Sequence, residues 1–84
     1  IFPENKPYLA DFYKDIKNKL DTSGIIINKI DHLEYCEKYY FTFKDELAVI
    51  QFYYKKDGIF KKLISDDHTT TSQILVDKVL NILK

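Results

Sequence analysis

Side chains that could act as nucleophiles or metal ligands are few and lie in two places along the chain. Asp31, His32 and Cys36 are close together, and Asp66-Asp67-His68 form a continuous run. A zinc site uses pairs of Cys or His on both sides of a loop, and a cysteine nucleophile needs a base and an oxyanion hole. Neither pattern is present in the sequence. We therefore expect no catalytic residue, no metal and no cofactor, and a protein that is not an enzyme.

The two glycines, Gly24 and Gly58, are both accounted for by expected turns. Loops that cradle phosphates need several glycines at fixed spacing, so a nucleotide-binding loop is excluded. The Asp66-Asp67-His68 run precedes an expected helix, where acidic side chains interact favourably with the helix dipole. We therefore interpret this run as structural.

A second kind of chemistry comes from aromatic rings that alternate with lysines in the middle of the chain. If this part forms strands, one sheet face carries six such residues: Lys38, Tyr40, Tyr53, Lys55, Phe60 and Lys62. Rings that stack on unpaired bases, with lysines along the backbone, are typical of sheets that bind single strands. The sequence thus predicts a surface for single-stranded DNA or RNA.

The charge balance limits the strength of such binding. The chain has 13 basic and 13 acidic residues, and every basic residue is a lysine. Without arginine, the chain lacks the planar fork that binds phosphate or guanine through two parallel hydrogen bonds. Contact with two to four phosphates would give weak binding, with a salt slope of about 0.7 per phosphate. The alternative is a structural or protein-interaction module that docks on a neighbouring domain or a second copy.

The first element expected is an amphipathic helix over residues 7–21. Leu9, Phe12, Ile16 and Leu20 recur at steps of three and four residues and form one apolar stripe. Gly24 follows and is expected to end the helix, because glycine readily adopts the left-handed conformation past a C-terminus.

Four strands are expected next, over residues 25–33, 35–44, 47–56 and 59–65, because β-branched and aromatic residues alternate with polar ones. A connection at Asp45-Glu46 predicts a register with Phe43 opposite Ala48, Phe41 opposite Ile50 and Tyr39 opposite Phe52. In this register, apolar side chains of one strand lie opposite apolar side chains of its neighbour.

The last two strands are expected to join at Asp57-Gly58, a strong hairpin signal, which would place Leu63 near Phe52. The segment from Thr70 to Gln73 matches a capping box, so Thr70 is the expected N-cap of a final helix. The helix that follows is apolar on most sides and is expected to pack on the sheet.

These elements predict an α+β fold in two layers: helix, four-stranded antiparallel meander, helix, with both helices on one sheet face. The 84 residues suffice for one small domain. Because the chain starts at Ile1 and has no methionine, we expect it to be excised from a longer protein. No segment is apolar enough to span a membrane, and a lone cysteine favours a reducing, cytoplasmic setting. The sequence leaves the oligomeric state open.

Overall fold

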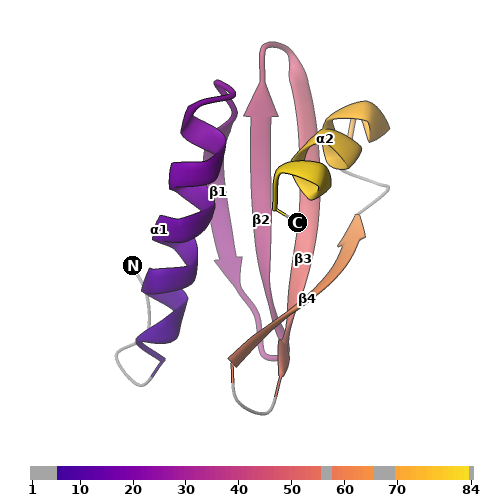
Figure 1. The fold of residues 1–84 in the computed structure, drawn as a ribbon. Helices are drawn as coiled ribbons and strands as arrows, with labels where there is room; N and C mark the ends of the chain where they lie inside the picture. The colour runs from indigo at the N-terminus through magenta and orange to yellow at the C-terminus, as the bar shows by residue number, and fades with distance from the viewer. Residues whose placement is uncertain (1–5, 56–57, 66–69, 84) are drawn as a thin grey trace.

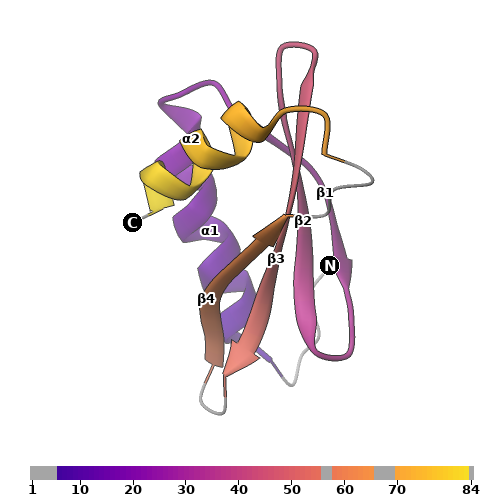
Figure 2. The same ribbon diagram turned by 90° about the vertical axis from the view of Figure 1, so that its right-hand side faces the viewer.

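The computed structural model describes the backbone of residues 6–55, 58–65 and 70–83, and the side chains of residues 6–53 and 70–83. The elements are α1 (Tyr8–Asp21), β1 (Ile26–His32), β2 (Cys36–Phe43), β3 (Glu46–Lys55), β4 (Gly58–Ser65) and α2 (Gln73–Leu83). The strands form one antiparallel sheet in the order β1-β2-β3-β4 (Figure 1). Figure 2 shows both helices on the same side of this sheet. The predicted α+β class, with two helices and an antiparallel sheet, is confirmed.

The predicted stripe of α1 faces the sheet. Leu9, Ile16 and Leu20 are buried, and Phe12 packs against the core. Gly24 adopts a φ of 74°, and the amide of Ile25 donates to the carbonyl of Leu20 over 3.3 Å. This is the six-to-one bond of a Schellman motif, so the helix ends where the sequence predicted.

The register between β2 and β3 differs from the prediction by two residues. Tyr39 pairs with Ile50, Phe41 with Ala48 and Phe43 with Glu46. The prediction was wrong because the chain turns at Lys44-Asp45, where Lys44 adopts a φ of 56°. Non-glycine residues seldom take this left-handed conformation, so Lys44 carries no turn signal. A shift by an even number leaves every side chain on its predicted face.

The backbone of β4 pairs with β3, and Leu63 lies opposite Phe52 as predicted. Lys55 pairs with Gly58, so Gly58 belongs to β4 rather than to the turn predicted at Asp57-Gly58. Asp57 itself lies outside the described residues. The pairing has an irregularity between Phe52 and Tyr54.

The predicted capping box of α2 is wrong. The helix starts at Gln73, and the Oγ of Ser72 accepts a hydrogen bond from the amide of Leu75 over 3.2 Å, so Ser72 is the cap. Thr70 and Thr71 instead accept hydrogen bonds from the amides of Val49 and Leu47, over 3.1 and 2.7 Å. A tertiary contact with β3 thus replaces the local interaction that the motif suggested.

The core lies between the helices and the face of the sheet that carries Tyr39, Ala48 and Phe52. The rings of Phe12 and Tyr39 each meet the ring of Phe52 edge to face, at centroid distances of 5.1 and 5.2 Å. The remaining buried members of this core are Ile16, Leu20, Ile25, Phe41, Ile50, Leu75, Val76, Val79 and Leu83. We call this the covered face.

Among the described side chains, one charged residue is buried on the covered face. Glu37 is fully buried, and its Oε1 lies 2.5 Å from the Nδ1 of His32 on β1. A buried carboxylate requires hydrogen-bond partners, which explains why His32 is directed toward it.

Neither α1 nor α2 has the length and apolar character needed to cross a membrane, and no other helix occurs in the described residues.

Candidate functional site

The sheet face opposite the helices, which we call the open face, carries the alternate side chains of the strands. Side chains alternate along a strand, so the neighbours of buried Tyr39 and Phe41 point away from the helices. In register, Tyr40 lies opposite Lys29 of β1 and Val49 of β3. Lys38, Tyr40 and Tyr53, three of the six predicted binding residues, lie on this face.

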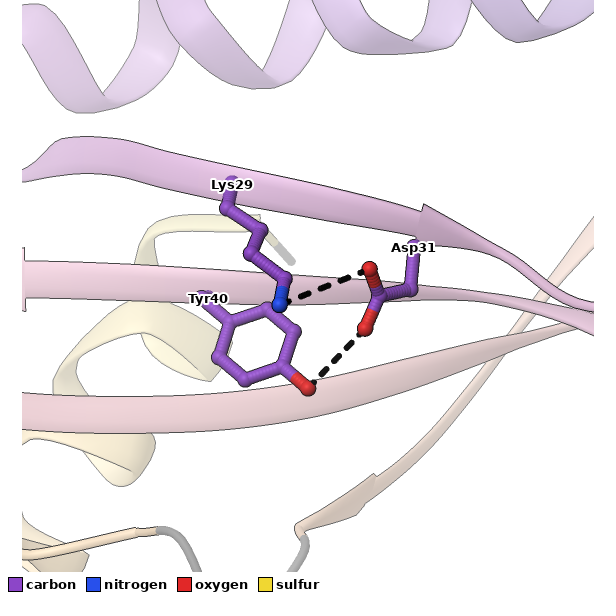
Figure 3. Close-up of polar contacts among 3 residues, drawn as sticks. All are labelled: Lys29, Asp31 and Tyr40. Atoms are coloured by element: carbon purple, nitrogen blue, oxygen red, sulfur yellow. Dashed lines mark hydrogen bonds and ion pairs between the residues drawn. The ribbon is translucent and has the colours of Figure 1, made fainter.

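A cluster of four side chains on β1 and β2 is the best-defined feature of the open face. We call Lys29, Asp31, Lys38 and Tyr40 the Tyr40 cluster. The Tyr40 hydroxyl donates to Asp31 Oδ2 over 3.0 Å, and the Nζ of Lys29 lies 3.7 Å from Asp31 Oδ1 (Figure 3). The Nζ atoms of Lys29 and Lys38 lie 4.9 and 5.6 Å from the centroid of the Tyr40 ring. Two cations and one carboxylate thus surround one aromatic ring.

The contacts of this cluster are accessible and individually weak. The side chains of Lys29 and Asp31 are 57% and 36% exposed. An ion pair of this kind contributes about 0 to 1 kcal/mol, and an exposed cation–π contact about 0.5 to 1 kcal/mol. The Lys29 side chain can therefore leave the ring at small cost when a more strongly negative group approaches.

Tyr53 belongs to a second polar group on the same face. Its hydroxyl donates to the Oε1 of Gln51 over 3.0 Å, and the Sγ of Cys36 lies 3.7 Å from the same oxygen. Gln51 pairs in register with Lys38, so this group adjoins the Tyr40 cluster. The two groups form one continuous polar and aromatic strip across β1, β2 and β3.

Three predicted binding residues lack described side chains. Lys55 lies on β3, where its backbone pairs with Gly58, and Phe60 and Lys62 lie on β4. Their side chains lie outside the described part of the structure, so their role stays a prediction.

Lys29 and Asp31 were absent from the predicted site, although the structure places them beside Tyr40. An irregularity in β1 between Ile27 and Lys29 changes the alternation at this point, so counting from Ile25 does not assign the face. Two charged residues spaced by two within an isoleucine-rich strand were the available signal.

The geometry offers no support for cysteine chemistry. Cys36 is 4% exposed, and burial raises the pKa of its thiol above the ordinary value, with the Glu37 carboxylate adding to the shift and Lys38 opposing it. The imidazole of His32 pairs with Glu37 rather than with the thiol. Within residues 6–53 and 70–83, no group of three His, Cys, Asp or Glu side chains could hold a metal ion. The Asp66-Asp67-His68 run lies outside the described residues.

A known family model matches nearly the whole chain. The family model TBP-TOTE, the TATA-binding-like protein domain of the TOTE conflict systems, matches residues 6–83. No curated protein and no solved structure matches the chain. The matched residues include both helices and every strand of the sheet. The chain, a small binding or accessory domain, therefore belongs to the family of TATA-binding-like protein domains of the TOTE conflict systems.

Proposed function

We propose that this domain is a non-catalytic accessory module that binds nucleic acid through the open face of its four-stranded sheet. The observation that carries the proposal is the Tyr40 cluster, which places an aromatic ring between two lysines on a sheet surface that neither helix covers. Tyr53 extends the surface along β3, and Lys55, Phe60 and Lys62 are further proposed contacts.

The family description supports a nucleic-acid ligand. It names a TATA-binding-like protein, and proteins that bind the TATA element use a β-sheet to contact DNA. In this domain the helices occupy one sheet face and leave the other for a ligand. The family relationship and the geometry of the open face therefore favour the same surface.

The chemistry of this surface favours a single strand over a duplex. All 13 basic residues of the chain are lysines. Minor-groove readers often insert apolar wedges that kink the duplex, whereas stacking of unpaired bases needs only accessible rings and nearby cations. Tyr40 and the ammonium groups of Lys29 and Lys38 provide both. We expect modest affinity that falls steeply with salt.

A salt titration with fluorescent single-stranded oligonucleotides, followed by anisotropy, tests the proposal. If Lys38 neutralises one phosphate, Lys38→Gln lowers the slope of log affinity against log salt by about 0.7. Lys14→Gln is the matched control, because Lys14 is an exposed lysine of α1. We expect it to leave both affinity and slope unchanged.

Two results would contradict the proposal. One is the absence of binding to single strands and to duplexes at low salt. The other is an equal loss of affinity in Lys14→Gln and in Lys38→Gln, which would indicate attraction by overall charge rather than by the open face.

The competing function is protein docking, with a second copy of the chain as the partner. Ile74 on the outer side of α2 is 78% exposed and borders an open groove with Asp77 and Lys78. In an antiparallel pair of α2 helices, each Asp77 would approach a Lys78 of the other copy. Sedimentation that depends on concentration, and is lost in Ile74→Glu, would favour this function. A strict monomer would rule it out.

A further inference from the structure

The hydroxyl end of the Tyr40 ring presents a hydrogen-bond acceptor and a donor side by side. Asp31 Oδ2 accepts from the Tyr40 hydroxyl over 3.0 Å, and Lys29 Nζ lies 3.7 Å from Asp31 Oδ1. Each carboxylate oxygen has two acceptor sites, so both oxygens keep capacity for a ligand. In Figure 3 the ring is seen face-on, with the carboxylate beyond its hydroxyl. A flat group stacked on this ring would therefore reach both charges with one edge.

We infer that this corner recognises an unpaired guanine, an inference that rests on the nucleic-acid function proposed above. The Watson–Crick edge of guanine carries two adjacent donors, N1–H and the N2 amino group, followed by the O6 acceptor. The two oxygens of Asp31 match the donors, and the ammonium of Lys29 matches O6. Unpaired bases on sheet proteins are read in this way, by stacking and by hydrogen bonds to that edge.

The other bases fit less well. Adenine and cytosine each offer one amino group to the carboxylate, next to a ring nitrogen that repels it. Uracil and thymine offer one N3–H between two carbonyl oxygens, so the second carboxylate oxygen would face an acceptor. Because guanine alone offers two adjacent donors to the two oxygens of Asp31, we expect guanine to bind most tightly and the other three bases more weakly.

Binding requires the Lys29 side chain to move, and the geometry permits this movement. Lys29 Nζ lies 4.9 Å from the ring centroid, which is the space that a stacked base would occupy. The side chain is 57% exposed, so it can move to the edge of the base while it stays near Asp31. The cation exchanges an aromatic contact for a hydrogen bond to O6.

Short oligouridine RNAs that contain one central guanine, adenine, cytosine or uracil test the inference. We measure their affinities for the domain by fluorescence anisotropy at low salt. A carboxylate that accepts two hydrogen bonds discriminates by about 1 to 3 kcal/mol, so one guanine should raise the affinity roughly tenfold over uracil alone. Asp31→Asn should abolish this preference, because an amide offers one acceptor and one donor. Lys14→Gln, on α1, should retain it.

The outcomes separate this inference from the function on which it rests. Binding of all four RNAs with equal affinity, or a guanine preference that survives in Asp31→Asn, would overturn the guanine site and leave nucleic-acid binding intact. Failure of every RNA and DNA probe to bind at low salt would overturn the proposed function and the guanine site together.

Discussion

The covered face and the open face are built from the same strands, yet their aromatic side chains differ in burial and in the interactions that they make. On the covered face, Tyr39, Phe41 and Phe52 are fully buried and pack ring against ring. On the open face, Tyr40 and Tyr53 are half-buried and hydrogen-bond through their hydroxyl groups. One face forms the core of the fold, and the other leaves aromatic rings and cations partly exposed.

The exceptions on each face show that position alone does not decide the role of a residue. Glu37 is charged but lies on the covered face, where His32 satisfies it. Cys36 and Val49 lie on the open face but are buried. Val49 is the register partner of Tyr40, whose ring lies between β2 and β3 in Figure 3. Cross-strand neighbours therefore control exposure as much as the face does.

Two adjacent residues of β3 test the comparison most directly. Phe52→Ala should lower the free energy of unfolding by about 4 kcal/mol, because it empties the space between Phe12 and Tyr39. Tyr53→Ala, one residue further on, should lower it by only about 2 kcal/mol, because it removes one hydrogen bond and a half-buried ring. Urea denaturation gives both values, and Phe52→Leu serves if the alanine variant does not fold. Equal losses at the two positions would refute the distinction between the faces.

Loss of the contact to the buried carboxylate of Glu37 should give the next largest change in stability. His32→Ala should lower the free energy of unfolding by about 2 kcal/mol, because the buried Glu37 side chain loses a hydrogen-bond partner. Tyr35→Ala is the control on the same hairpin, since Tyr35 is 71% exposed. We expect the control to change stability by less than about 0.5 kcal/mol. An unchanged free energy of unfolding in His32→Ala would show that the burial of Glu37 does not depend on this contact.

The cap of α2 provides a smaller effect. Ser72→Ala should lower the free energy of unfolding by about 1 kcal/mol, because the Leu75 amide loses its partner. Ser72→Asp retains a capping oxygen and should stay close to the parent. If Ser72→Ala were neutral in thermal denaturation, the cap would have to lie elsewhere.

Cys36 provides the smallest effect at neutral pH. Because its pKa is raised in the folded protein, the folded state keeps the thiol proton where the unfolded chain has already released it. Stability linked to Cys36 is therefore complete below the unfolded pKa, about 8.5, and is lost as the pH rises through the folded pKa. Cys36→Ala should remove this part of the decline between pH 8 and 10 in denaturant titrations.

Thiol reactivity checks the same group independently. A disulfide reagent should react slowly with folded protein at pH 7.5 and quickly once guanidinium unfolds the chain, because the thiolate is the reactive form. Fast reaction of the folded protein would indicate an accessible thiolate, contrary to the burial of Cys36.

Much of the fold could be predicted because it depends on local patterns. The steps from Leu9 to Leu20 predicted α1, and Gly24 marked its end. The alternation along β2 placed Tyr39 on one face and Tyr40 on the other. These features follow from the helical and strand periods, which act over a few residues.

The candidate site was only partly predictable. Lys38, Tyr40 and Tyr53 follow from alternation within strands, and the structure places them on one face. Asp31 and Lys29 reach Tyr40 only because β1 pairs with β2 in a register that contains an irregularity. The spacing of Lys29 and Asp31 along β1 indicates a shared face, but it does not indicate that Tyr40 lies on the same face.

The sequence by itself determined the order of the elements, the ends of the first helix and the faces of the central strands, because local periodicity and turn chemistry control them. The tertiary structure decided the register at Lys44-Asp45, the docking of Thr70 and Thr71 on β3, and the meeting of Asp31 with Tyr40. The contacts of Thr70, Thr71 and Asp31 each join two separate elements of the fold. Which register and which contacts form depends on how the whole domain packs its core and satisfies its backbone hydrogen bonds.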